Sequence, residues 1–502
     1  MLLAASAESQ TAPRDTTIDG QHYTLHPIET LIAQLGRNAA TPITYRHTAF
    51  QGRLFATLDT VYAPLDLEDI HFLDEVALNG VVFVAPVHIR QAVFANGLSL
   101  QRSRFSADVD FSAGQFPKHA TFKEAEFRGG VNFSASRYTA VASFVAADFA
   151  GRENRFDRTA FDHAAYFDEA HFSGRADFQD ATFADLASFK ETVWQQGASF
   201  AGARFGGRAL FWDARFAAET TFATARADGE IAFNRSTFTG PVAFAGFIFA
   251  QPALFNRVTC ADEATFAGAY FRKTADFTDG TFRSDLRLDA IFNQALDLRR
   301  ASIQLLDLQR PASSDSTFAA PARLYLQQTH YRHILVRWHQ LAGHLAAADT
   351  LALDDLEPVY ATLRRQLHAQ GLKRDADACF VEWMERRRQH ASWTDSEFYA
   401  LSLLQTTTRY GTDPTHFAGS AICIVLLFGL AYRLGRDAIE MPHGDTSPSL
   451  AACLLFSLQT FIRCDASPLR LTGPIRLLAD LQALTGWIYL GLLLAILLAQ
   501  FS

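Results

Sequence analysis

Phenylalanine recurs between Phe105 and Phe282 in alternating steps of five and six residues, so that the pattern repeats every eleven residues. Polar and small residues separate these positions, which we call rungs. On a helix, such steps would turn by about 140° and about 240° and would spread the rings over two faces. On a flat strand, a step of five residues would reverse the face. The pattern therefore predicts a chain that bends at each step and returns every ring to one interior.

Most rungs are phenylalanine, and a small residue precedes many of them by two positions, as Ala120 precedes Phe122. The rungs that depart from phenylalanine are Tyr138, Trp194, Ala227 and Cys260. We expect a narrow core built from these rings, with the following residues as representatives: Phe122, Phe127, Phe178, Phe183, Phe205, Phe211, Phe277 and Phe282.

The segments Ala176 to Phe183 (ADFQDATF) and Ala275 to Phe282 (ADFTDGTF) resemble the pentapeptide-repeat family. This resemblance implies a mainly β solenoid, a right-handed and four-sided β-helix with Phe and Ala inside and polar residues outside. We expect this β-helix over residues 41–310, with an N-terminal cap over residues 1–40. Some members of the family mimic DNA through an acidic outer face and bind topoisomerases, and that role is an alternative here.

Helical patterns replace the ladder of rungs after Phe318, and we assign residues 318–392 to an α-helical hairpin linker. Helices are expected from Ala322 to Ala348, from Leu356 to Gln370 and from Arg374 to Arg388. The last ends in three arginines, which we interpret as a solvated helix end that could also contact anionic lipid. His330 and His333 are one helical turn apart, but no carboxylate or cysteine joins them in register, so no metal site is expected.

Three apolar stretches follow in residues 393–502 and predict a membrane domain. The first and third, about residues 414–434 and 477–501, are long enough to span a bilayer. The middle stretch, about residues 449–462, is too short to cross and has the length of a re-entrant helix. The order predicted is therefore a two-helix transmembrane hairpin with a re-entrant, pore-like helix between its spans.

Three short segments of this domain resemble the two-transmembrane, potassium-channel-like modules that bacteria append to pentapeptide repeats. They are Tyr410 to Pro414 (YGTDP), Phe456 to Phe461 (FSLQTF) and Gln482 to Gly486 (QALTG). The resemblance places the pore or filter at Ser457, Gln459, Thr460, Arg463, Cys464 and Asp465, and it assigns Gln482 and Gly486 to the inner helix. The family carries glutamate where Gln482 stands.

The stretch that would form the filter departs from a potassium filter. Such a filter needs glycines, because its backbone carbonyls must replace the hydration shell of the ion. No glycine lies between Gly444 and Gly473. Potassium selectivity is therefore not expected, and Arg463 would oppose cation entry unless Asp465 or a partner neutralises it.

Composition narrows the functional classes further. The 502 residues include 44 Phe but only 13 Tyr and 6 Trp, and the formal net charge is -8. No basic stripe stands out in the first 400 residues, so nucleic acid is not an expected partner. The five cysteines are scattered without CxxC spacing, and no nucleophile–base pairing or phosphate loop is present. We expect neither an enzyme nor a cofactor.

Two functions remain open at this stage. In the first, the membrane domain forms a homo-oligomer, with a tetramer as one option, and passes ions without potassium selectivity, with Thr460, Arg463 and Asp465 at the narrow point. In the second, the hairpin is a non-conducting anchor, and the β-helix binds a protein partner. The resemblance implies a bacterial protein of the cytoplasmic (inner) membrane, in contact with lipid. The opening residues lack a signal peptide, so we expect the N-terminal domain in the cytoplasm.

Overall fold

The computed structural model describes residues 14–37, 41–55, 58–309, 317–319, 321–346, 353–435, 439–440, 448–462, 470–471 and 473–501. The chain divides into an N-terminal unit, Met1–Val359, and a C-terminal unit, Tyr360–Ser502. Each unit is described by itself.

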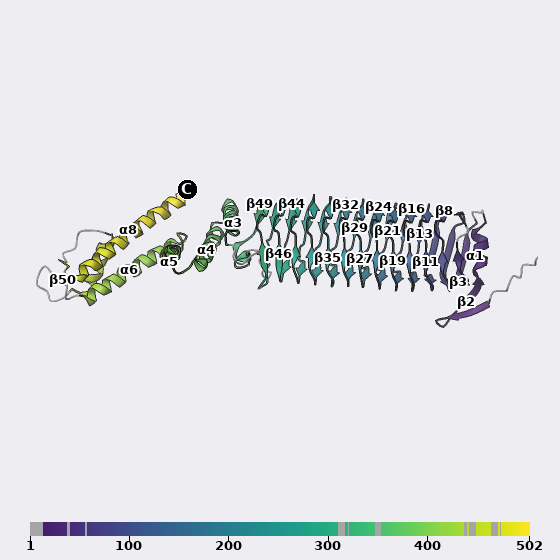
Figure 1. Ribbon diagram of the computed structural model, residues 1–502, viewed down its shortest axis with the longest axis horizontal. Coiled ribbons are helices and arrows are strands. Elements are labelled where there is room, and N and C mark those ends of the chain that lie inside the picture. Colours follow the sequence, from purple (N-terminus) through teal and green to yellow (C-terminus); the bar gives the residue numbers. More distant parts are fainter. Residues whose placement is uncertain are drawn as a thin grey trace, which may run out of the picture. The chain divides into compact units, whose positions relative to one another are not determined.

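The N-terminal unit is a β-solenoid built from short strands, most of them two residues long. Within the coils, each strand pairs in parallel with the strand one coil further on, as β12 (Arg104–Phe105) pairs with β16 (Glu126–Phe127). One sheet contains 13 strands, from β4 (Leu54–Phe55) to β48 (Arg323–Tyr325), and takes one strand from each coil. The strands stack side by side along the solenoid (Figure 1).

The interior contains four columns of aromatic rings, one for each side of the coil. In one column, the ring centroids of Phe156 and Phe178 are 4.7 Å apart, and those of Phe178 and Phe200 are 5.0 Å apart, with the rings nearly parallel. Rings of neighbouring columns meet edge to face, as Phe167 and Phe178 do at 5.4 Å. These are the two favoured arrangements of aromatic pairs. All eight representative rings are buried, with at most 3% of their surface exposed.

The backbone explains why steps of five and six residues alternate. In each five-residue step the second residue after the rung adopts a left-handed conformation, as at Arg102, Ala113 and Glu124, with φ between 55° and 57°. This conformation turns the chain sharply within a short step. A six-residue step turns by using an additional residue instead. The left-handed residues recur every eleven positions, which is the period seen in the sequence.

One coil contains an additional residue near Arg152. There β21 (Glu153–Arg155) is three residues long, and Asn154 takes the inward position that a small residue occupies elsewhere. Its side-chain amide donates hydrogen bonds to the carbonyl oxygens of Gly151 and Arg175, at 3.2 and 3.4 Å. Backbone acceptors thus satisfy the buried donor, as burial of a polar group requires.

The rung at Ala227 lacks a ring, and Phe247 supplies one. Phe247 takes the inward position two residues before the rung Phe249, where most coils have a small residue. Its ring stacks on Phe249 at 4.0 Å, and Phe271 stacks on the other face of Phe249 at 4.4 Å. Since Ala227 pairs with Phe249 on the side opposite Phe271, the Phe247 ring fills the space that a phenylalanine at position 227 would occupy.

Both ends of the solenoid are covered. At the N-terminal end, β1 (Arg14–Ile18), β2 (Gln21–Pro27) and α1 (Ile28–Leu35) precede β3 (Ile43–Gln51), which pairs with β6 (Leu65–Phe72). At the C-terminal end, Phe318 stacks on Phe292, and His344 stacks on Phe318. The short helix α2 (Trp338–Leu341) lies in this last segment.

The helix expected from Ala322 to Ala348 is wrong. This segment forms β48 and β49 (His330–Leu335), which pair with β46 (Ala295–Asp297) and β47 (Ser302–Asp307) and extend the solenoid beyond residue 310. The inward residues here include Leu324 and Ile334, both fully buried. Aliphatic rungs carry no ring signature, and their spacing is compatible with a helical stripe, so periodicity alone misassigned them.

The C-terminal unit is helical. Its first helices are α3 (Glu357–Ala369), in which the boundary between the units falls, α4 (Lys373–His390) and α5 (Ser396–Thr408). They are followed by α6 (Pro414–Leu434), α7 (Leu450–Ile462) and α8 (Pro474–Phe501). A two-residue antiparallel pair, β50 (Ile439–Glu440) and β51 (Arg470–Leu471), joins the segments on either side of α7. Figure 1 shows α6 and α8 as the two long helices of this unit.

Candidate functional site

Helices α6 and α8 are long and apolar enough to cross a bilayer, by length and composition. The span in α6 covers Pro414–Leu434, and the span in α8 covers Pro474–Leu494. Only 11% and 22% of these windows are buried inside the protein. Both helices therefore expose most of their apolar surface, unlike the core helix of a soluble domain. Between them, α7 has 13 residues and is too short to cross.

Local sequence fixes where α6 begins. The side chain of Asp413 accepts hydrogen bonds from the backbone N–H groups of Thr415 and His416, at 3.0 and 3.1 Å. Pro414 occupies the first turn, where its missing N–H costs nothing. The preceding turn holds three successive left-handed residues, Arg409, Tyr410 and Gly411, which reverse the chain after α5.

A buried polar network joins α6, α7 and α8. The side-chain amide of Gln482 on α8 donates to the carbonyl oxygen and to the hydroxyl of Ser457 on α7, at 3.0 and 2.6 Å. The hydroxyl of Tyr432 on α6 donates to the Gln482 side-chain oxygen at 2.7 Å. All three residues are fully buried. Polar groups in such surroundings must find partners, and here each pairs across helices.

The geometry of this network favours an amide side chain at position 482. The Gln482 amide donates to Ser457 and accepts from Tyr432 at the same time. An ionised carboxylate can only accept, so it would face the Ser457 carbonyl oxygen without a proton to share. The network therefore selects an amide at this position.

Two glycines allow α7 to approach the long helices closely. A Cβ atom added to Gly486 on α8 would lie 1.9 Å from the carbonyl oxygen of Phe461 on α7. A Cβ atom added to Gly429 on α6 would lie 2.5 Å from the Leu454 side chain. The first contact involves backbone, which cannot swing away. Gly486 thus sets the position of the C-terminal end of α7, next to the segment expected to form the filter.

The structure brings together some of the site residues expected from the sequence. Ser457, Gln482 and Gly486 lie at the contacts between α7 and α8, whereas Gln459 and Thr460 are half-buried on α7. Arg463, Cys464 and Asp465 lie outside the described residues. Sequence reasoning missed Tyr432, although a tyrosine followed by an arginine at the end of an apolar span was a visible signal.

A second polar cluster joins the helices that precede α6. Glu385 on α4 accepts hydrogen bonds from Arg388, from Gln405 on α5 and from the hydroxyl of Tyr410, at 2.6 to 3.1 Å. The Arg388 guanidinium is the main cause that lowers the pKa of Glu385 to about 2, and burial raises the pKa of Tyr410 to about 12. Glu385 thus links α4, α5 and the turn before α6.

The three arginines at the end of α4 all have carboxylate partners. Arg386 pairs with Glu382 at 3.1 Å and Arg388 with Glu385 at 2.6 Å, and Arg387 pairs with Glu397 of α5. The Arg387–Glu397 pair joins α4 to α5, whereas the other two pairs lie within α4.

The outer surface of the solenoid carries ion pairs between successive coils. Residues in register pair with opposite charges at the same place on neighbouring coils, and their distances are between 2.5 and 3.0 Å: Arg102–Glu124, Arg104–Glu126, Arg208–Glu230, Arg235–Asp213 and Arg300–Asp279. Each exposed pair contributes little to stability, about 0 to 1 kcal/mol. Each pair places opposite charges on neighbouring coils, so the two charges partly cancel there.

The comparison with known families agrees with the solenoid. A family model described as pentapeptide repeats (9 copies) matches three overlapping ranges, 156–193, 167–215 and 178–226. No curated protein and no solved structure matches the chain. The matched ranges lie in the middle of the solenoid, and the same stacked-ring pattern continues on both sides of them. The solenoid of this chain is therefore a pentapeptide-repeat β-solenoid.

Proposed function

We propose that this protein is a membrane-anchored pentapeptide-repeat protein whose C-terminal unit assembles as an oligomeric ion-conducting pore without potassium selectivity. The observation that carries the proposal is the position of α7. A helix of 13 residues, too short to span, is fixed between two long apolar helices by Gln482, Ser457 and Tyr432. A simple anchor needs only one span and has no use for a half-helix fixed between two spans.

Two spans with a half-helix fixed between them support the proposal. When α6 and α8 span the bilayer, α7 ends within it. The segment that follows α7 would then line the narrow point of the pore. Gly486 sets the end of α7 through its contact with the Phe461 carbonyl. One chain cannot enclose a central pore, so the proposal requires several copies, and four is the number that the resemblance suggests.

Ion flux into liposomes tests the proposal. The full chain, reconstituted in liposomes of phosphatidylethanolamine and phosphatidylglycerol, is expected to pass sodium and potassium at similar rates. Arg463→Gln should raise cation flux, because it removes a positive charge at the narrow point. Arg374→Gln is the matched control, since it makes the same change of charge on an exposed site of α4. Flux no greater than in protein-free liposomes, at several voltages, would contradict the pore.

A second function is favoured by the filter sequence. No glycine lies between Gly444 and Gly473, and carbonyl-lined filters need glycine to form. In this alternative the hairpin is a non-conducting anchor, and the solenoid binds a protein partner. A chain truncated after Ser392 should then remain soluble and retain the partner in a pull-down. Loss of every partner on truncation would count against the scaffold.

A further inference from the structure

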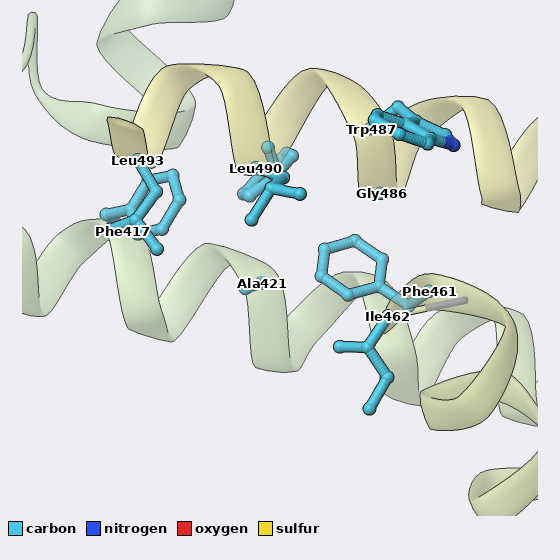
Figure 2. Close-up of a pocket in the computed structure, with 9 residues that line it drawn as sticks. Phe417, Ala421, Phe461, Ile462, Gly486, Trp487, Leu490 and Leu493 are labelled. Atoms are coloured by element: carbon cyan, nitrogen blue, oxygen red, sulfur yellow. The ribbon is translucent and has the colours of Figure 1, made fainter. Parts of the chain in front are cut away.

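A hollow of about 330 Å³ lies inside the C-terminal unit between α6, the end of α7 and α8. Figure 2 shows Leu490 reaching from α8 toward Ala421 on α6, with Phe461 at one end of the hollow and Phe417 at the other. The lining residues that matter here are Phe417, Ala421, Phe461, Tyr489, Leu490 and Leu493. The volume lies at the lower end of the range for ligand sites.

The lining offers hydrocarbon and aromatic surface. No charged residue contributes to it among the described residues. The hydroxyl of Tyr489 donates to the hydroxyl of Ser420 on α6 at 3.2 Å, so its polar end is already bonded. The Tyr489 ring packs between Phe417 at 5.2 Å and Phe461 at 5.5 Å. A polar ligand would lose its water here without gaining hydrogen bonds, which excludes that class.

Two apolar occupants could reach the hollow, a side chain of a second copy or an acyl chain of a membrane lipid. A lipid acyl chain is slender and is supplied by the bilayer around α6 and α8, which expose apolar residues such as Leu426 and Leu494.

We infer that this hollow is a binding site for one acyl chain of a membrane lipid. The site touches the end of α7 through Phe461 and Ile462 and touches α8 beside Gly486. The bound chain therefore supports the end of α7, from the side that the protein itself leaves open. This inference rests on the part of the proposed function that places α6 and α8 in a bilayer, and it does not depend on conduction.

Lipid retention by the full chain tests the inference. The chain is reconstituted in vesicles of phosphatidylcholine in which a known fraction carries brominated acyl chains, and it is recovered in mild detergent. Native mass spectrometry then counts the brominated lipid that remains bound. Wild type is expected to retain about one lipid per chain. Ala421→Trp fills the hollow, and denying burial to only two methylene groups corresponds to about tenfold weaker retention.

Controls separate the possible results. Ile422→Trp places the same ring on the adjacent, 60% exposed position and should retain lipid as wild type does. Ala421→Leu is a milder filling variant that keeps the test valid if the tryptophan variant misfolds, and it should lose retention in part. Equal retention by wild type and both Ala421 variants would overturn the inference.

Two further outcomes are distinct from these. A change of oligomeric mass in Ala421→Trp at unchanged lipid retention would assign the hollow to a second copy and would also overturn the inference. Failure of the wild-type chain to float with the vesicles would overturn the membrane part of the proposed function itself.

Discussion

Exchange of the residues at positions 227 and 247 tests the packing of the solenoid most sharply. Phe247 fills the space left by Ala227, and both side chains are fully buried. Phe247→Ala would remove a buried ring and leave a cavity, at a cost of about 3–5 kcal/mol. Ala227→Phe would force a second ring into filled space, at a cost of about 1–3 kcal/mol or more. The double variant restores the usual pattern of a ring at the rung and a small residue before it.

We therefore expect the double variant to be close to wild type, with a coupling energy of at least about 3 kcal/mol between the two sites. Hydrogen exchange of the full chain measures the local stability at these sites. The amides of Ile248 and Ala250 donate to the carbonyl oxygens of Ala225 and Ala227 in the preceding coil, so they report on this packing. Exchange in the Phe247→Ala variant should be at least about a hundredfold faster than in wild type, and in the double variant nearly unchanged.

Thr239→Ala, on the exposed surface of the neighbouring coil, is the control and should change stability by no more than about 0.5 kcal/mol. Exchange in the double variant as fast as in the worse single variant would show that the two rings do not share one space.

Four further predictions concern single residues. Gln482→Glu should destabilise the C-terminal unit by about 1–3 kcal/mol, seen as a lower melting temperature in detergent, because a carboxylate cannot donate to Ser457. The pKa of Glu385 is lowered from 4.5 to about 2, so the stability it contributes is present above about pH 4.5 and is lost as the pH falls toward 2. Glu385→Gln should thus lower stability by about 2 kcal/mol at pH 7, after allowance for solvent screening, and flatten that part of the pH profile of thermal unfolding. Burial raises the pKa of Cys379 to about 12, so mass spectrometry should find this thiol unlabelled by maleimide at pH 8 until the chain is denatured. Gly151→Ala should destabilise the solenoid by about 1–3 kcal/mol in denaturant, since a Cβ atom there would lie 2.0 Å from the carbonyl oxygen of Gly129, whereas Gly130→Ala has 3.4 Å of room and should not.

The solenoid was predictable from the sequence because its geometry leaves a periodic mark. A ring returns to the interior at each side of the coil, and no helix or flat strand gives steps of five and six residues. The prediction failed where the rungs are aliphatic instead of aromatic. Leu324 and Ile334 fill the interior of the last coils in place of aromatic rings. Aliphatic residues at this spacing fit a helix equally well.

The packing inside the C-terminal unit was harder to predict. The bounds of α6 and α7 follow from charge-free stretches, and they lie where apolar length placed them. Which residues meet across helices is decided in three dimensions, so the joining of Tyr432, Gln482 and Ser457 could not be derived from spacing. A useful clue was still present: a polar side chain inside an apolar span must find a partner, which makes Gln482 and Ser457 a natural pair.

The central claim is that α6 and α8 cross a bilayer while the solenoid stays outside it. Washing of membranes that contain the full chain with alkaline carbonate tests this most directly, because the treatment strips proteins held at the surface and leaves spanning helices in place. The account predicts that the chain remains in the membrane pellet and is released only by detergent. Recovery of the chain in the carbonate supernatant would contradict it.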